Sequence, residues 1–221
     1  MREAKLEPDK VSYSAGISAC EKSLHRRWAL ALFSEILEAK VEVDAISYSA
    51  VISSWGKGGQ WQQALALLSE MREANLEPDV ISYNARISAC ENGGQWQRAL
   101  ALLSEMCEAR LEPDIISYNA GISACEKGAQ WQRALALLCE VNEAQLEPDA
   151  ISYNAGMLAC EHSGQWQQVL SLLSKAKEAG LDTNANMYAT VTNVCEMGGQ
   201  WQKASSVLDD LLLKVGRCFV E

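Results

Sequence analysis

A period of 35 residues constrains this chain more than any other feature of its sequence. One tyrosine and one tryptophan recur at that spacing, as Tyr13, Tyr48, Tyr83, Tyr118, Tyr153 and Tyr188, and as Trp61, Trp96, Trp131, Trp166 and Trp201. Self-similarity at a fixed period of roughly 20 to 50 residues is typical of arrays in which each repeat buries its apolar face against the next. We therefore expect a repeat protein.

The repeats are delimited by starting each one three residues before its tyrosine. This gives five full repeats, at 10–44, 45–79, 80–114, 115–149 and 150–184, and a diverged C-terminal repeat or cap at 185–221. Residues 1–9, MREAKLEPD, match MREANLEPD at 71–79, so we interpret them as the end of a truncated repeat from a longer array. The whole chain, 1–221, is predicted to form a single solenoid.

Each repeat has the pattern of two helices joined by a turn. In the repeat 80–114, apolar residues recur at spacings of three and four in both halves, which is typical of the buried stripe of a helix. They are Val80, Tyr83, Ile87 and Cys90 in the first half, and Trp96, Ala99, Leu100, Leu103 and Met106 in the second. Gly93 and Gly94 lie between the halves and permit a tight turn. Because helices of about 12 residues are marginal alone, the pairs must stack, and the expected fold class is all-α, an α-solenoid (superhelix) of 35-residue helix-turn-helix repeats with a concave face.

The composition narrows the class of protein. The chain has 221 residues, of which 48% are hydrophobic, so it can bury a substantial core. No run approaches the ~18 uninterrupted apolar residues of a membrane-spanning helix, and we expect no membrane partner. The opening residues, MREAKLEPDK, lack the apolar segment of a secretory signal and carry too much acid for a transit peptide. We expect a soluble protein with no visible targeting segment.

The cysteines follow the repeat. Five of the eight are spaced by multiples of 35, namely Cys20, Cys90, Cys125, Cys160 and Cys195. Equivalent positions in stacked helices lie ~8–10 Å apart, whereas a disulfide requires Cα atoms within about 7 Å. The sequence has no Cys-x-x-Cys motif, and its two histidines, His25 and His162, have no ligand-spaced partner. We expect free thiols in a reducing compartment and no metal site.

Residues typical of catalysis are missing from the pattern. The sequence shows no nucleophile paired with a histidine base, no metal-ligand cluster and no phosphate-binding loop. We therefore expect a binding protein without enzymatic activity, without a cofactor and without a small-molecule substrate.

Three motifs carry a family resemblance. The repeats open with Ser-Tyr-Asn or Ser-Tyr-Ser, their second helix reads Ala-Leu-Ala-Leu-Leu, and they close with Leu-Glu-Pro-Asp. With the period of 35, this resembles the pentatricopeptide repeat family over nearly the whole chain. Tetratricopeptide repeats run to 34 residues and carry the tryptophan in the first helix, whereas here it opens the second.

The resemblance implies a nucleic-acid partner. Proteins of this family bind single-stranded RNA in organelles, one base per repeat, each base being read by a few side chains. The implied partners are single-stranded RNA and other RNA-processing proteins, and the implied location is the chloroplast or the mitochondrion.

The residues agree with this interpretation at one place. A second stripe, separate from the apolar one, runs along the first half of the repeat 80–114 as Ile81, Asn84, Ser88 and Asn92. Asparagine is unfavourable inside a helix, yet it recurs directly after the tyrosine in three successive repeats, as Asn84, Asn119 and Asn154. Because an amide both donates and accepts hydrogen bonds, such a stripe can face the edge of a base.

In the family, the residue after the tyrosine and the last residue of the same repeat jointly select the base. Here these pairs are Ser14 with Asp44, Ser49 with Asp79, Asn84 with Asp114, Asn119 with Asp149, and Asn154 with Asn184. By the family's pattern Ser/Asp favours G, Asn/Asp favours U, and Asn/Asn favours C or, less often, U. The implied target is 5′-GGUUC-3′.

The resemblance also implies stacking and phosphate contacts. The aliphatic residue before the serine would sandwich the base, which assigns stacking to Val11, Ile46, Ile81, Ile116 and Ile151. Lys22, Lys57 and Lys127 match the lysine that meets phosphate in the family, while Asn92, His162 and Met197 stand there in other repeats.

Each of these residues also has a structural interpretation. An aspartate before a helix is a preferred N-cap, the Ser or Asn after the tyrosine can lie on a solvated helix face, the aliphatic residues can belong to the core, and lysines are usually solvated. The recurring tyrosines and tryptophans are interpreted as core packing, with no binding role.

Charge supports a competing function. The chain has 19 basic and 29 acidic residues, a net charge of −10, which is the opposite of the basic surface expected of an RNA-binding domain. Much of the acid lies away from the proposed stripe, at Glu77, Glu112 and Glu147 and at Glu73, Glu108 and Glu143. The alternative function is an acidic α-solenoid protein–protein interaction scaffold that docks a basic partner.

Overall fold

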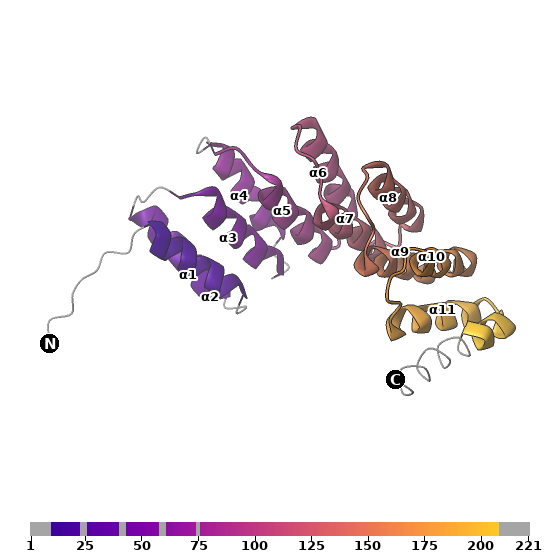
Figure 1. Cartoon of the computed structure of the whole chain (residues 1–221). Helices are drawn as coiled ribbons and strands as arrows, with labels where there is room; N and C mark the ends of the chain where they lie inside the picture. The colour runs from indigo at the N-terminus through magenta and orange to yellow at the C-terminus, as the bar shows by residue number, and fades with distance from the viewer. Residues whose placement is uncertain (1–9, 23–25, 40–42, 58–60, 74–75, 208–221) are drawn as a thin grey trace. The chain divides into compact units, whose positions relative to one another are not determined.

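The computed structural model describes residues 10–22, 26–39, 43–57, 61–73 and 76–207, and within these ranges the regular elements are α-helices (Figure 1). They are α1 (Lys10–Lys22), α2 (Arg26–Glu38), α3 (Ala45–Lys57), α4 (Trp61–Glu73), α5 (Val80–Asn92), α6 (Trp96–Glu108), α7 (Ile115–Lys127), α8 (Trp131–Glu143), α9 (Ala150–His162), α10 (Trp166–Glu178) and α11 (Ala185–Met197). Residues 201–207 are helical as well. The predicted all-α class is confirmed.

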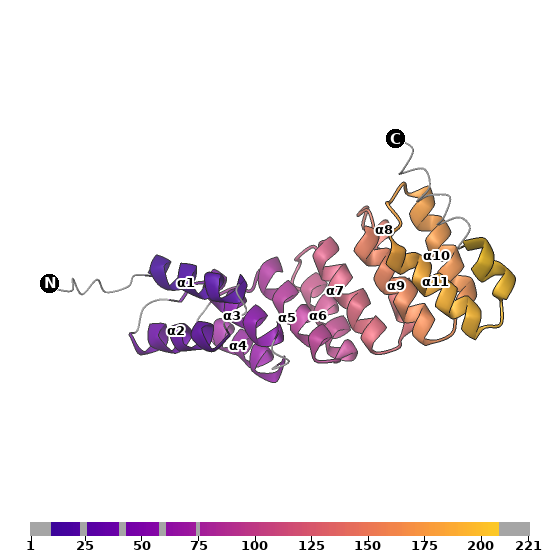
Figure 2. The same ribbon diagram turned by 90° about the horizontal axis from the view of Figure 1, so that it is seen from below.

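The chain divides into two compact halves, Met1–Pro113 and Asp114–Glu221. In the N-terminal half, α1, α3 and α5 pack side by side as a row of first helices, and each pairs with the helix that follows it (Figure 2). In the C-terminal half, α7, α9 and α11 form the same kind of row, with α8 and α10 behind it. A single solenoid over residues 1–221 stays a prediction.

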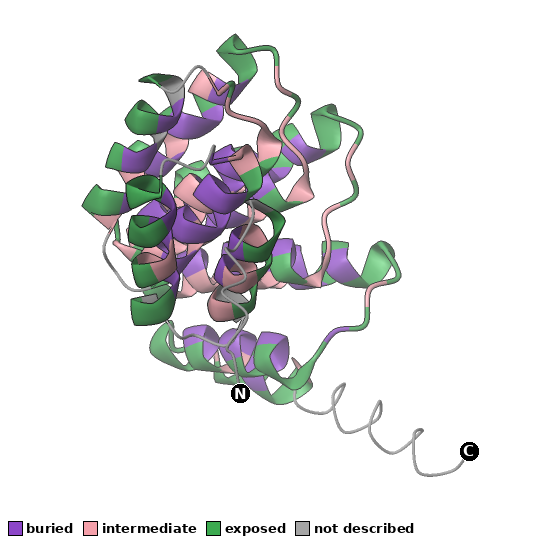
Figure 3. Ribbon diagram, turned by 90° about the vertical axis from the view of Figure 1, so that its left-hand side faces the viewer, coloured by how far each residue is buried: buried purple, intermediate pink, exposed green. Residues whose placement is uncertain are grey.

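The core of each half lies between its first helices and the second helices behind them. All six recurring tyrosines are buried, with exposed fractions between 1% and 8%. From the second helices, the stripe represented by Ala99, Leu103 and Met106 packs beneath them and is also buried. Figure 3 shows the buried residues where helices face one another and the exposed residues on the outward faces. The 3.6-residue period of the apolar stripe thus sets which face of each helix is covered.

The tryptophans at the repeat spacing differ from the tyrosines. Trp61, Trp96, Trp131 and Trp166 are half-buried, so they lie at the edge of the core, and Trp201 is 63% exposed, so its interpretation as a core residue is wrong. Trp61 lies over the turn of the next repeat, where a Cβ atom added to Gly93 would stand 2.3 Å from its Cδ1. On the same indole ring lies the Arg98 guanidinium, 4.4 Å from the ring centroid. The Trp61 ring therefore covers the contact between two repeats at the surface instead of filling the interior.

The turn glycines have two separate roles. Gly93 has an ordinary φ of −86° and is needed because Trp61 leaves no room for a side chain. The next position requires left-handed backbone, with φ of +66° at Gly94 and Gly164 and +67° at Gly199, in open space. Ala129 stands at the equivalent position with φ of +52°. An alanine there is strained, since its Cβ crowds the following carbonyl oxygen.

The cysteines at the repeat spacing are packing residues. Cys90, Cys125, Cys160 and Cys195 are buried, Cys20 is half-buried, and all the cysteines in the described part of the chain are free thiols. Burial raises the pKa of the Cys125 and Cys160 thiols to about 11. These two side chains therefore stay protonated and unreactive at neutral pH.

Two features are absent from the described residues. None of their helices combines the length and the apolar character that crossing a bilayer requires. Nor do His, Cys, Asp and Glu side chains gather in groups of three that could hold a metal ion.

The strained alanine predicts a stabilising substitution. We expect Ala129→Gly to raise the free energy of unfolding by roughly 0.5–1 kcal/mol, because relief of left-handed strain exceeds the entropy that glycine adds to the unfolded chain. Gly164→Ala, the reciprocal change at the equivalent turn, should lower it by a similar amount. Urea unfolding of the two variants measures both effects. Equal signs for the two changes would contradict the assignment.

Candidate functional site

The proposed stacking residues are exposed in all five full repeats. Val11, Ile46, Ile81, Ile116 and Ile151 are each the second residue of a first helix, and their side chains are 59% to 72% exposed. The interpretation of these residues as core is therefore wrong. A large aliphatic side chain in water at the same position of five repeats gains nothing from folding, so these side chains are available to a ligand.

The residue after each tyrosine lies one helical turn further along. We call Ser14, Ser49, Asn84, Asn119 and Asn154 the selector residues. Ser49 and Asn84 are buried, with 5% and 9% of their surface exposed, and the other three are half-buried. Their interpretation as a freely solvated helix face is therefore wrong. Ser14, Ser49 and Asn119 lie at the joint between one first helix and the next, because each is within hydrogen-bond distance of a serine on the following first helix.

The last residue of each repeat caps the following helix, as the structural interpretation predicted. The side chains of Asp44, Asp79, Asp114, Asp149 and Asn184 accept the backbone N–H three residues later, at 2.9, 2.8, 2.9, 2.8 and 3.0 Å. A side-chain oxygen at this position satisfies an otherwise unpaired helix N–H. Capping fixes these five side chains at the starts of the first helices, so the structural role and a binding role are compatible.

Two of the predicted pairs are joined by hydrogen bonds. The Ser14 hydroxyl donates to the two Asp44 carboxylate oxygens over 3.3 and 3.4 Å. The Asn119 Nδ2 donates to those of Asp149 over 3.2 and 3.4 Å. In these two repeats the selector side chain therefore contacts the side chain of the last residue, although the two are 30 positions apart in sequence.

The other pairs behave differently. The Ser49 hydroxyl donates to the Ala45 carbonyl oxygen over 2.8 Å and lies 3.0 Å from the Ser82 hydroxyl. Asn84 and Asp114 belong to different halves of the chain, and each is placed within its own half. In the fifth pair, Oδ1 of Asn154 is buried without a hydrogen-bond donor.

Sequence reasoning missed a third residue at each joint. The serine before the tyrosine, found at Ser47, Ser82, Ser117 and Ser152, is fully buried. We call these four the joint serines. Three of them contact the selector residue of the preceding repeat within the same half of the chain: Ser47 lies 2.7 Å from Ser14, Ser82 lies 3.0 Å from Ser49, and Ser152 donates to Asn119 Oδ1 over 2.6 Å. The signal available in the sequence was a small polar residue at a position flanked by apolar ones.

Electrostatics at the joint favour a charged aspartate. Burial raises the pKa of Asp149, but hydrogen bonds from the backbone N–H and hydroxyl of Ser152, from the Asn119 amide and from the Ile151 backbone outweigh it. Together they hold the pKa of Asp149 below its ordinary value of 3.8. The joint therefore presents an anionic acceptor at neutral pH, suited to an N–H donor.

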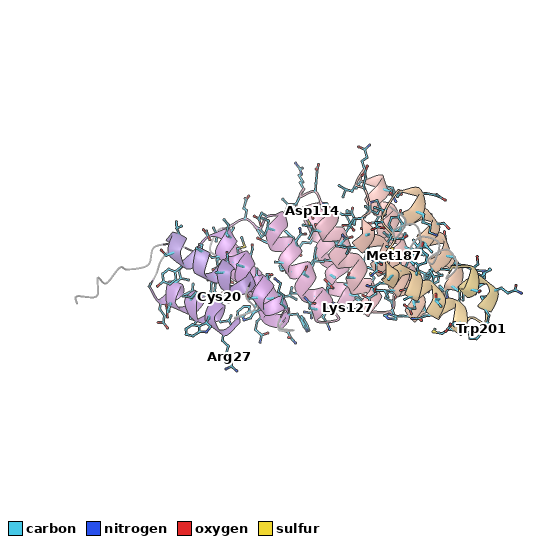
Figure 4. All side chains as sticks on the ribbon, turned by 60° about the horizontal axis from the view of Figure 1, so that its bottom comes forward. Cys20, Arg27, Asp114, Lys127, Met187 and Trp201 are labelled. Carbon is cyan, nitrogen blue, oxygen red and sulfur yellow. The ribbon has the colours of Figure 1, made fainter. Side chains whose placement is uncertain are left out.

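The proposed phosphate contacts lie at the far end of the first helices. Lys57 and Lys127 are exposed and are the last residues of α3 and α7, whereas the side chain of Lys22 lies outside the described residues. Figure 4 shows Asp114 and Lys127 at opposite ends of α7. Ile116, Asn119 and Lys127 follow spacings of three and eight, which place them on one helix face. Asn92, His162 and Met197, which replace the lysine, are exposed too.

The comparisons with known proteins agree with this architecture. The family model described as a pentatricopeptide repeat domain matches residues 31–93, 66–128 and 101–163, which together span more than half of the chain. No curated protein matches the chain in sequence.

Solved structures share the fold. The pentatricopeptide repeat protein PPR10 of maize, in complex with an 18-nt psaJ RNA element, is 25% identical with a TM-score of 0.69, over 95% of this chain and 29% of PPR10. The PPR domain of Arabidopsis thaliana protein-only RNase P 1, in complex with tRNA, is 13% identical with a TM-score of 0.70, over 88% of this chain and 98% of that domain. Nuclear proteinaceous RNase P 2 of the same plant is 12% identical with a TM-score of 0.68, over 84% of this chain and 42% of that protein.

This chain therefore spans less than a third of PPR10, and the two RNase P likenesses concern the fold alone. The α-solenoid class expected from the sequence is confirmed by these structures. On the match of the family model, the chain belongs to the pentatricopeptide repeat family.

Proposed function

We propose that this chain binds single-stranded RNA along its first helices, one base per repeat. The observation that carries the proposal is the exposure of the five aliphatic residues, each of which stands three residues before a selector residue on the same helix face. PPR10, whose fold it shares, was solved with an RNA element bound. An apolar surface beside a polar one suits a nucleobase, which has an apolar face and a hydrogen-bonding edge.

Base recognition is assigned to the selector residue together with the last residue of its repeat. An amide has two N–H donors and an oxygen with two lone pairs. The bonds of Asn119 to Asp149 and Ser152 therefore leave one donor and one acceptor site for a base edge. Applied to the five pairs, the family's pattern gives the proposed target 5′-GGUUC-3′.

The biological role follows from holding RNA in an unpaired state. A segment lying along the helices is protected from nucleases, prevented from refolding, or presented to a separate RNA-processing protein. We assign no catalytic step, cofactor or small-molecule substrate to the chain. We propose the chloroplast or the mitochondrion as its compartment, on the family's usual location.

The acidic composition sets an expectation for affinity. Glu108 and Glu143, at the ends of α6 and α8, and Glu147 are exposed and lie outside the first helices. With three lysines at phosphates, the logarithm of affinity should fall with the logarithm of salt concentration with a slope of about −2. Most of the affinity must then come from stacking, and we expect weak binding.

A second function is favoured by one observation, the net charge of −10. A protein scaffold that docks a basic partner would use the acidic surface and would not need the selector pairs. RNA titration separates the two functions: equal, negligible binding of GGUUC and of a scrambled oligonucleotide at two salt concentrations favours the scaffold.

Base selection is tested at the fourth repeat. We expect Asn119→Ser to shift the preference at the fourth base from U to G, because it converts the Asn/Asp pair with Asp149 into a Ser/Asp pair. Loss of a base-edge contact corresponds to about 1–3 kcal/mol, or roughly 5- to 150-fold in the ratio of affinities for GGUUC and GGUGC. Fluorescence anisotropy measures the four affinities.

The matched control is Asn142→Ser, the same change at an exposed position of α8, where Asn142 donates only to the Leu138 carbonyl oxygen. The control should bind both oligonucleotides as the unmodified protein does. An unchanged base preference in Asn119→Ser would rule out the base assignment.

The stacking role of the aliphatic residues is also tested at the fourth repeat. Ile116 is 59% exposed, so Ile116→Ala should leave thermal stability unchanged while weakening RNA binding about fivefold, as expected from losing roughly 1 kcal/mol of apolar contact. Leu37→Ala, at a 46% exposed position of α2, is the control and should leave binding unchanged. Equal affinities for the Ile116 and Leu37 variants would place the RNA elsewhere.

A further inference from the structure

The fifth repeat lacks one contact that the other described joints have. Three joints each bring a serine hydroxyl to the preceding selector residue, over 2.7, 3.0 and 2.6 Å. At the joint between α9 and α11 the equivalent residue is Met187, fully buried, with its backbone N–H donating to the Asn184 cap. Figure 4 shows Met187 on α11. A thioether sulfur cannot donate a hydrogen bond.

The consequence appears on the selector residue of that repeat. Oδ1 of Asn154 is buried and has no hydrogen-bond donor, whereas Oδ1 of Asn119 accepts the Ser152 hydroxyl over 2.6 Å. The amide of Asn119 is held in one orientation, because turning it over would place its oxygen against the Asp149 carboxylate that now accepts Nδ2. For Asn154 neither constraint exists, since Met187 replaces the serine and Asn184 replaces the aspartate.

We propose that the residue before the tyrosine of the following repeat is a further specificity-determining position. A serine there fixes which end of the preceding selector amide faces the base, and Met187 leaves the Asn154 amide to present either end. An amide oxygen accepts from the donor of a pyrimidine edge and an amide nitrogen donates to its acceptor, so an amide that turns over accepts both C and U. The fifth base is therefore read less selectively than the fourth.

This inference rests on the proposed RNA binding and adds to it a position outside the selector pairs. The experiment measures the affinities of GGUUC, GGUUU and GGUCC. The ratio for GGUUU and GGUUC reports selectivity at the fifth base, and the ratio for GGUCC and GGUUC reports it at the fourth.

Met187→Ser should move the fifth-base ratio about two- to tenfold away from its value in the unmodified protein, towards stronger discrimination, as expected for one added hydrogen bond. The fourth-base ratio should stay constant. Met187→Leu is the control, because it keeps an apolar side chain without a hydroxyl, and it should change neither ratio. In Met187→Ser, the Asn154 side-chain amide protons should also shift in NMR spectra without RNA.

Ser152→Ala makes the reverse test and does not depend on the folding of Met187→Ser, which removes a buried side chain. It leaves the cap between Asp149 and the backbone N–H at residue 152 in place. The fourth-base ratio should fall about two- to tenfold and the fifth-base ratio should not change.

The outcomes are distinct. If the unmodified protein binds none of the oligonucleotides, the proposed function falls and this inference falls with it. If it binds GGUUC but Ser152→Ala and any folded Met187→Ser leave both ratios unchanged, the proposed function stands and the joint residue has a packing role only.

Discussion

The contact between one first helix and the next is the interaction on which the rest of the structure depends. A single pair of 13-residue helices such as α7 and α8 cannot bury its apolar stripes alone, so each repeat is stable only through its neighbours. That same contact determines where the selector residues lie. A side chain such as Asn119 belongs to one repeat but finds its hydrogen-bond partners, Asp149 and Ser152, at the start of the next. The same residues at this contact therefore stabilise the fold and position the candidate site.

This sharing explains why polar side chains are tolerated at the joint. A buried hydroxyl or amide is unfavourable unless it is hydrogen-bonded, and at Asn119 the cap aspartate and the joint serine satisfy both ends of the amide. The aspartate is required by the helix terminus in any case, since it accepts a backbone N–H there. The polar groups of a selector residue can therefore be held in a fixed position without the free-energy cost of burying an unpaired polar group. Asn154 shows the opposite case, in which replacing one partner by Met187 leaves a buried acceptor unpaired.

Much of this was readable from the sequence, for a physical reason. The periods of 35 and 3.6 residues are properties of the chain, so the tyrosine core, the helix pairs and the aspartate caps could be predicted, whereas the sequence left open whether Ile116 was exposed or part of the core. Contacts that depend on the distance between neighbouring repeats could not. The half-buried place of Trp61 follows from the room left over Gly93, and the role of Ser152 follows from a hydroxyl brought within 2.6 Å of an amide 33 positions away. Neither distance is encoded in the spacing of residues along one helix.

The departures from the repeat then carry more information than the repeat itself. Where the repeat is regular, as at Asp149 and Ser152, helix capping and the candidate site require the same residues, so the sequence there does not distinguish the two roles. Where a position breaks the pattern, they separate. Ala129 affects the backbone of an exposed turn at the other end of α7 from Ile116, so its effect falls on stability and not on the selector residues. Met187 keeps its helix capped and its side chain buried, so the change it makes falls on the amide of Asn154, which belongs to the candidate site. The selector residues of such an array can thus vary one joint at a time, because each joint has its own helix cap and its own buried apolar residues.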